Sequence, residues 1–181
     1  MNSFYSKEDL QQLGFKSVGD FVFISKKCSI YGYKTISIGS HVRIDDFCIL
    51  SGEITIGNYV HISAYSALYG GGGIIIEDFC GISPRCTLFS ASDDFSGEHM
   101  ISPMVPKEIT AVKREKIHMK KYSQLGTNTT ILPGVSIETG TVTGACSLVN
   151  HNLPSWTICW GIPCIPRKTR AKKIKELSKK I

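Results

Sequence analysis

The 181-residue sequence lacks any uninterrupted apolar stretch that approaches the roughly 20 residues needed for a bilayer-spanning helix. Residues 1–15 carry acidic groups and do not show the basic-then-apolar layout of a secretory signal. We therefore expect no membrane span and a cytoplasmic location. There are seven cysteines, an odd number, which without such a signal argues against a disulfide framework.

A basic surplus is also missing from most of the chain. The sequence has 21 Lys+Arg and 15 Asp+Glu, a formal net charge of +6. Residues 167–181 hold 8 basic residues and one acidic residue, which leaves 13 basic against 14 acidic residues elsewhere. A nucleic-acid-binding domain usually spreads its basic residues over a face of the fold, so we predict no nucleic-acid partner. Two interpretations of the +7 end stay open: a solvated amphipathic helix, or an anion site for a phosphate-bearing ligand.

The sequence does contain a repeat with a period of six residues. A helix would show a period of 3.6 and a simple strand a period of 2, so neither explains it. Six residues for each flat face and three faces for each turn predict a parallel β-solenoid of about six coils. The key positions of the predicted coils are Val18/Ile24/Ile30, Ile38/Ile44/Leu50, Ile56/Ile62/Leu68, Ile76/Ile82/Leu88, Met119/Leu125/Ile131 and Ile137/Thr143/Val149.

Breaks in the period fall between the predicted coils. The spacing is eight instead of six between Ile30 and Ile38 and between Leu68 and Ile76, so the extra residues are expected to bulge at a corner. Glycine follows a key position where we expect the backbone to turn tightly. These glycines are Gly19, Gly39, Gly57 and Gly126.

The register gives four cysteines a packing role. Cys28, Cys48 and Cys86 each lie two positions before a key residue of the third face, and Cys80 takes the equivalent place on the second face. This slot holds a small residue that points inward, so we interpret the four as inert packing thiols. The other three cysteines have no His or Cys at zinc-ligand spacing, and we predict no metal site.

Three segments are predicted. Residues 1–17 form an N-terminal helical segment, in which residues 6–9 resemble a capped helix start. Residues 18–166 form the β-helix, with an extruded loop at residues 89–118, and residues 167–181 form a basic C-terminal helix. Long loops that leave a rigid scaffold usually carry function, so the loop is the first place to look for catalytic residues.

Two motifs add to the repeat, namely residues 128–135 (NTTILPGV) and residues 161–163 (GIP). With these motifs, residues 18–168 resemble the hexapeptide-repeat, left-handed β-helix acyltransferases that use acetyl-CoA. Loop residues 92–97 (SDDFSG) are similar to the sugar acetyltransferase branch, which includes galactoside O-acetyltransferases and viosamine-type N-acetyltransferases of nucleotide-linked 4-amino-4,6-dideoxy sugars. The resemblance implies an all-β, left-handed parallel β-helix that assembles as a homotrimer, with active sites between adjacent chains.

The same resemblance implies that acetyl-CoA lies along the last coils. Its pantetheine arm would bond to backbone near Gly126, Gly144 and Ala145. Arg167 and Lys168 would approach its phosphates, although which basic side chains meet them stays open. A +7 end on a nearly neutral body would attract such a polyanion.

The acceptor is predicted from a departure from the family pattern. Many O-acetyltransferases of the family have a catalytic His where this chain has Asp93. A hydroxyl needs a base as it attacks a thioester, whereas part of an amine population is already neutral. We therefore expect transfer to the amino group of a dTDP-linked 4-amino-4,6-dideoxyhexose, for surface polysaccharide (O-antigen) biosynthesis. Asp93 or Asp94 would orient the ammonium group and take its proton; the alternative is that the pair caps a loop turn.

Two other functions stay open. The chain could O-acetylate a sugar hydroxyl of the galactoside or maltose type, with His99 or a histidine of a neighbouring chain as the base. It could also be a trimeric scaffold or binding module without catalysis. None of the enzymatic interpretations requires a cysteine nucleophile or a metal ion.

Overall fold

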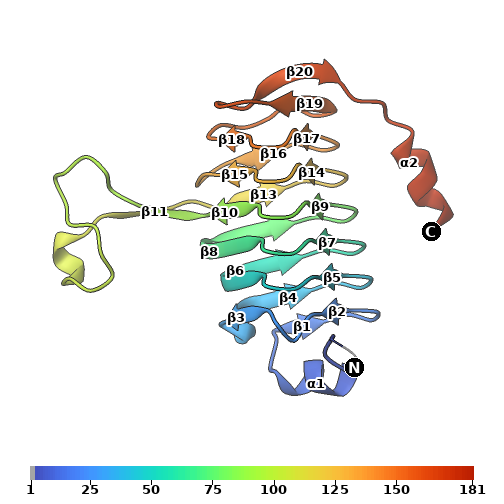
Figure 1. The fold of residues 1–181 in the computed structure, drawn as a ribbon, viewed down its shortest axis with the longest axis horizontal. Helices are drawn as coiled ribbons and strands as arrows, with labels where there is room; N and C mark the ends of the chain where they lie inside the picture. Colours follow the sequence, from blue (N-terminus) through green and yellow to red (C-terminus); the bar gives the residue numbers. More distant parts are fainter. Residues whose placement is uncertain (1–2) are drawn as a thin grey trace.

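The structure, a computed structural model, describes residues 3–181 and is a stack of parallel β-coils with short helical elements at both ends (Figure 1). A hairpin projects from one side of the stack, and the C-terminal segment descends along another side. In chain order the elements are α1 (Lys7–Gln12), β1 (Ser17–Val18), β2 (Phe23–Ile24), β3 (Ser29–Tyr31), η1 (Tyr33–Thr35), β4 (Ile36–Ile38), β5 (Arg43–Ile44), β6 (Ile49–Ile56), β7 (His61–Ile62), β8 (Ala67–Ile76), β9 (Gly81–Ile82), β10 (Thr87–Phe89), β11 (Ala91–Asp93), η2 (Lys107–Ile109), β12 (Val112–Arg114), β13 (Ile117–Met119), β14 (Gln124–Leu125), β15 (Thr130–Ile131), β16 (Ser136–Ile137), β17 (Val142–Thr143), β18 (Leu148–Val149), β19 (Thr157–Trp160), β20 (Ile165–Thr169), α2 (Ile174–Leu177) and η3 (Ser178–Lys180).

Strands of successive coils pair in parallel, which confirms the predicted solenoid and its register. Ile44 pairs with Ile62 on the second face, and Leu50 pairs with Leu68 on the third. The second face is one sheet in the order β2-β5-β7-β9-β14-β17-β19-β20. The first and third faces share a sheet because β6 and β8 run around the corner between them. A further partial coil, at Leu153 and Cys159, continues the stack beyond the six predicted.

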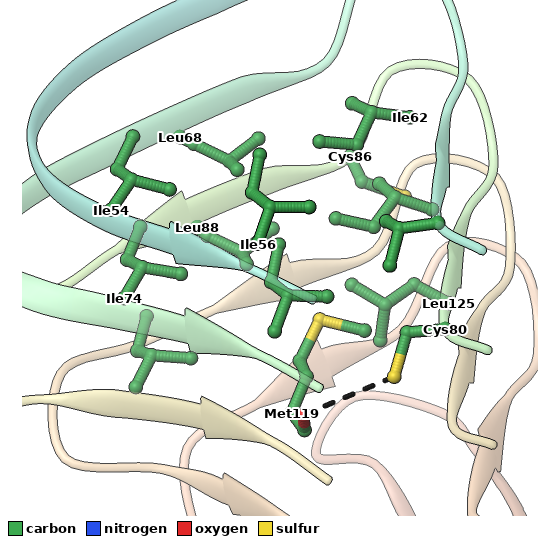
Figure 2. Packing of buried hydrophobic residues seen from close by; sticks show 14 of the residues in the cluster. Ile54, Ile56, Ile62, Leu68, Ile74, Cys80, Cys86, Leu88, Met119 and Leu125 are labelled. Carbon is green, nitrogen blue, oxygen red and sulfur yellow. Dashed lines mark hydrogen bonds between the residues drawn. The ribbon is translucent and has the colours of Figure 1, made fainter. Parts of the chain in front are cut away.

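The key positions point into the stack and form its core. Among them only Val18, in the first coil, is half-buried, and the others are buried. Figure 2 shows how side chains from successive coils, such as Leu68 and Leu88, pack on one another. Full burial of one such aliphatic side chain contributes about 1.5–3 kcal/mol, which explains why the period of six is kept along the chain.

The buried cysteines fill the slot predicted for them. The Cys48 Sγ lies 3.2 Å from the Ser63 carbonyl oxygen, and the Cys86 Sγ lies 3.2 Å from the Gly126 carbonyl oxygen. Burial raises the pKa of the Cys80 and Cys86 thiols to about 11. These thiols therefore stay protonated at neutral pH, as expected for packing groups.

Two of the three corners contain non-glycine residues with positive φ, which the sequence did not reveal. At one corner the rings of Phe21, His41, Tyr59, Phe79 and Tyr122 stack at successive centroid distances of 4.6–5.4 Å. A left-handed conformation costs roughly 1–2 kcal/mol for an L-residue. Ring pairs contribute about 0.5–1.5 kcal/mol each beyond their buried area, so the stack offsets much of this strain.

The third corner carries the extra residues. Residues 33–35 form the turn η1 there, in agreement with the predicted bulge. Residues 70–73 also bulge as predicted, although they lie within β8: Gly70 pairs with Gly52 and Ile74 pairs with Ile54, so the register between β8 and β6 shifts there by two residues. The second break in the period is therefore a bulge within a continuous strand.

Both ends of the solenoid carry helical elements. The predicted capping box begins α1: the Asp9 N–H donates to Ser6 Oγ, and the Ser6 N–H donates to Asp9 Oδ2, both at 3.0 Å. The C-terminal helix is shorter than predicted, because β20 occupies residues 165–169 and α2 begins only at Ile174. Within residues 3–181, no helix is long and apolar enough to cross a membrane.

Candidate active site

The predicted catalytic loop is a hairpin on a fixed neck. Strands β11 and β12 pair antiparallel, and the buried Ser90 anchors them to the stack. Its Oγ donates to the Tyr69 carbonyl oxygen at 2.8 Å and accepts from the Gly72 N–H at 2.9 Å, while its carbonyl oxygen accepts from the Glu115 N–H at 2.9 Å. The sequence analysis did not single out Ser90, since a lone serine after a strand has no distinctive local signal.

Asp94 and His99 lie together within this hairpin. The Asp94 carboxylate accepts from the Ser96 hydroxyl at 2.7 Å and from the Ser96 N–H at 2.9 Å, and lies 2.8 Å from His99 Nδ1. The bonds from Ser96, followed by the one from His99, lower the pKa of Asp94 to about 2. Asp94 therefore forms the loop turn that was the alternative interpretation of the aspartate pair. A carboxylate with so low a pKa is a weak proton acceptor.

Asp93 is placed differently from its neighbour. It ends β11 and is exposed, and within residues 3–181 its carboxylate forms no hydrogen bond or ion pair. It lines two adjoining hollows, of about 430 and 330 Å³, together with Phe95. Asp93 is thus the member of the pair that is free to meet a ligand.

The predicted cofactor glycines lie on successive coils. The Ser83 N–H donates to the Leu125 carbonyl oxygen at 3.0 Å, and the Gly126 N–H donates to the Thr143 carbonyl oxygen at 3.0 Å. Ser83, Gly126 and Gly144 therefore form one column along the edge of the second face, with the exposed Ala145 beside it. Because two of these residues have no side chain, the column presents a strip of bare backbone.

Close packing of the coils explains why these positions are glycine. A Cβ on Gly126 would lie 2.6 Å from the Thr143 carbonyl oxygen, and one on Gly144 would lie 2.8 Å from the Trp160 Cβ. Neither glycine has a positive φ, and the predicted tight turn begins at Gly126, whose carbonyl oxygen accepts from the Thr129 N–H at 3.2 Å. The strip suits the extended arm of CoA, but the close packing of the coils is by itself enough to explain why the strip is flat.

We expect Gly126→Ala to destabilise the protein in the absence of CoA. The new methyl group would press on the backbone of the next coil, and overpacking of this kind costs about 1–3 kcal/mol. Urea unfolding without CoA measures the change. Ala145→Gly, at the exposed neighbouring position, is the control and should change stability less. Unchanged stability of Gly126→Ala would contradict the packing explanation.

Arg167 and Lys168 lie on β20, at the far edge of the second-face sheet, where Lys168 pairs with Ile158 of β19. Both are exposed, and the Arg167 guanidinium carbon lies 5.8 Å from the centroid of the Trp160 ring. They continue the direction of the glycine column. Their positions are consistent with contact to the phosphates of CoA.

The rest of the basic end does not join them. Arg170 turns inward, and its Nη1 donates to the carbonyl oxygens of Tyr122 at 2.7 Å and Gly140 at 3.0 Å. Farther on, Ser178 Oγ lies 2.7 Å from the Tyr122 hydroxyl, so the tail descends along the aromatic corner (Figure 1). The +7 end is therefore divided between two places and is not one anion site.

The structure thus assembles two groups of predicted residues within one chain. In the loop group, Asp94 and His99 are in hydrogen-bond contact and Asp93 lies beside them. In the column group, the glycine column shares a sheet with Arg167 and Lys168. Across residues 3–181, no hydrogen bond or ion pair joins the loop group to the column group. Residues 3–181 contain no group of three His, Cys, Asp or Glu side chains that could hold a metal ion.

No family model matches the chain. Among curated proteins, the chain is 41% identical to a dTDP-4-amino-4,6-dideoxy-D-glucose acyltransferase of Escherichia coli. The match extends over 171 residues, which are 93% of this chain and 89% of that protein. A galactoside O-acetyltransferase of Lactococcus lactis is 28% identical over 52% of this chain and 42% of its own length.

Solved structures of AntD, an N-acyltransferase from Bacillus cereus, match with a TM-score of 0.97 and 49% identity over 99% of this chain and 97% of that chain. They include complexes with dTDP and coenzyme A and with dTDP-4-amino-4,6-dideoxyglucose and coenzyme A. Another, at 50% identity, holds dTDP and 3-hydroxybutyryl-CoA. Several carry substitutions at an aspartate or at a serine ten positions before it.

Coils with a six-residue period, an extruded hairpin and a bare backbone column define a hexapeptide-repeat β-helix protein of the acyltransferase type. The chain belongs to the hexapeptide-repeat acyltransferase family, in the branch of the sugar acyltransferases, and it is an acyltransferase. The family predicted from its residues is thereby confirmed.

Proposed function

We propose that this enzyme transfers an acyl group from acyl-CoA to the amino group of a dTDP-linked 4-amino-4,6-dideoxyhexose, in the cytoplasm, for surface polysaccharide biosynthesis. The observation that carries the proposal is a pair of residues. AntD, which binds such a sugar, has been studied at an aspartate and at a serine ten positions earlier. Of the seven aspartates in this chain, only Asp93 has a serine ten residues before it, Ser83.

The positions of these residues support direct attack by the amine. Ser83 lies in the same column as Gly126, one coil away, so a thioester held on the glycine strip would end near the Ser83 hydroxyl. The free Asp93 carboxylate would orient the ammonium group and accept its proton. The neutral amine nitrogen then forms a bond to the carbonyl carbon and the C–S bond breaks. A second proton passes from the nitrogen to the departing CoA thiolate, and the proton on Asp93 is released to solvent.

We also propose a homotrimer, because one chain does not bring the two residues together. Ser83 follows β9, at the corner between the second and third faces, whereas Asp93 lies on the hairpin that leaves after β10 and projects away from the stack (Figure 1). In a trimer, the hairpin of a neighbouring chain would cover the Ser83 corner. The mass of the protein in solution, measured by light scattering, tests this proposal.

An acceptor panel tests the proposed activity. Release of free CoA, followed with a thiol-reactive dye, should be faster with dTDP-4-amino-4,6-dideoxyglucose than with galactosides or maltose. Running the panel with acetyl-CoA and with 3-hydroxybutyryl-CoA identifies the acyl group. Equal or greater release with the plain sugars would overturn N-acylation. If CoA fails to raise the melting temperature, the non-catalytic scaffold becomes the better interpretation.

One observation favours O-acylation as a second candidate. The 2.8 Å contact between Asp94 and His99 Nδ1 would hold the ring so that Nε2 could act as a base toward a hydroxyl. We expect His99→Asn to retain most of the turnover with the amino sugar, since an amine needs no such base. If His99→Asn instead abolishes all turnover, and the plain sugars are the better acceptors, then O-acylation is the function.

A further inference from the structure

The outer side of the second-face sheet has one position without a side chain. The outward residues on four neighbouring strands of this sheet are Arg43, His61, Gly81 and Gln124. Gly81 is buried, although the residues on either side of it are not. Its φ is not positive, so the backbone conformation does not require a glycine there. Another part of the chain must therefore cover this position.

The side chain of Gln124 occupies the space over Gly81. A Cβ on Gly81 would lie 2.9 Å from Gln124 Cδ and 3.1 Å from Gln124 Nε2. The two residues are register partners on β9 and β14, which are adjacent strands of the sheet (Figure 1). The glycine thus makes room for the amide of Gln124, which lies over the sheet instead of extending into solvent.

This amide is bonded to Ser83 in a defined orientation. Gln124 Nε2 donates to Ser83 Oγ at 3.2 Å and to the Leu125 carbonyl oxygen at 3.3 Å. Because a carbonyl oxygen can only accept, the end of the amide on this side is the NH₂ group. The Ser83 N–H donates to the same Leu125 carbonyl oxygen at 3.0 Å. The three residues therefore form one closed hydrogen-bonded group.

The bond from Gln124 determines what the Ser83 hydroxyl can do. A serine hydroxyl has one hydrogen to donate and two lone pairs that accept. Ser83 Oγ accepts from Gln124, and within residues 3–181 no group of the chain accepts a hydrogen bond from it. Its hydrogen is therefore left for a group outside the chain, at the end of the glycine column.

We propose that Gln124 is a positioning residue for acyl transfer: it holds Ser83 so that the hydroxyl donates to the thioester carbonyl oxygen of acyl-CoA. As the amine attacks, this oxygen gains negative charge. A donor that already points at the oxygen stabilises the charge while it keeps its own proton. Gln124 acts only through Ser83. The inference rests on the proposed function, since it assigns the residue that orients one group of the same active site.

Gln124→Met tests the proposal, because methionine has nearly the same length and still covers Gly81 but has no N–H group. We expect kcat for the amino sugar to fall about 10- to 100-fold, less than the loss of about 10²- to 10³-fold for removal of such a donor itself. KM for both substrates should stay within about twofold, since the hydroxyl meets a charge that develops only in the transition state. Steady-state CoA release measures both constants. A side chain that merely covers Gly81 would be replaced by methionine without loss of kcat.

Two further variants show whether the effect passes through Ser83. In a Ser83→Ala background, Gln124→Met should change kcat by about twofold or less, because no hydroxyl remains to be held. Gly81→Ala should lower kcat as much as Gln124→Met does, since its methyl group displaces the amide while Gln124 itself is unchanged. An equal loss with and without the Ser83 hydroxyl would overturn the proposal, and so would a fully active Gly81→Ala variant.

The outcomes separate this proposal from the proposed function. If the wild type releases no CoA with the amino sugar, the proposed function itself is wrong. If the wild type is active and Gln124→Met keeps the full kcat, only the role of Gln124 is overturned. Each variant should bind CoA as the wild type does, which excludes misfolding as the cause of a lower kcat.

Discussion

Asp93→Asn is expected to lower kcat for the amino sugar about 10²- to 10⁴-fold, the range typical for loss of a positioned proton acceptor. The amide keeps the shape of the side chain but neither accepts the proton nor attracts the ammonium group. Affinity for CoA should stay the same, because the glycine column lies outside the hairpin. Steady-state CoA release and a CoA titration together measure both quantities.

Asp94→Asn is the matched control, with the same chemical change one residue farther on. Its expected effect on kcat is smaller, because the structure uses Asp94 to hold the Ser96 turn and His99. The hairpin should become easier to cleave by protease, since the variant loses its charge-assisted bonds. If Asp94→Asn abolishes activity while Asp93→Asn is nearly as active as the wild type, the assignment of the two aspartates has to be exchanged.

Leu125→Ala should lower the free energy of unfolding by about 2–5 kcal/mol. Leu125 is fully buried, pairs with Ile82, and directly precedes Gly126. Its removal leaves a cavity between two coils, since each coil packs only on its neighbours. Urea unfolding measures the loss, and Val142→Ala, on the outer side of the next strand, should cost clearly less. A loss below about 1 kcal/mol would contradict the packing described for this column.

The sequence predicted the coils because burial imposes one inward position in every six residues. Positions such as Ile62 and Leu88 are apolar for a reason that acts in every coil, so the signal accumulates along the chain. The positive-φ corners have no such signal. Phe79 and Tyr122 adopt that conformation because they stack on each other across coils 43 residues apart in sequence, and local propensity does not report such a contact.

The site was predicted in its elements but not in its details. Asp93 and Asp94 are chemically the same residue, and only the folded loop, through Ser96 and His99, makes one a turn former and leaves the other free. The role of Ser83 in the site was not predicted, because it depends on the position of this residue one coil away from Gly126 in the folded structure. The charge of the tail was counted correctly, but a sum of charges does not show that Arg170 turns inward to two carbonyl oxygens.

The neck of the hairpin has a consequence for how such enzymes diversify. Because β11 pairs with β12 and Ser90 fastens both to the stack, the chain leaves and re-enters the solenoid at one place. Lengthening a loop whose ends are already held together costs only about 0.6 kcal/mol for each doubling. The sequence and length of the hairpin can therefore change, and adapt to new acceptors, without any change in the coils or in the donor strip built on them.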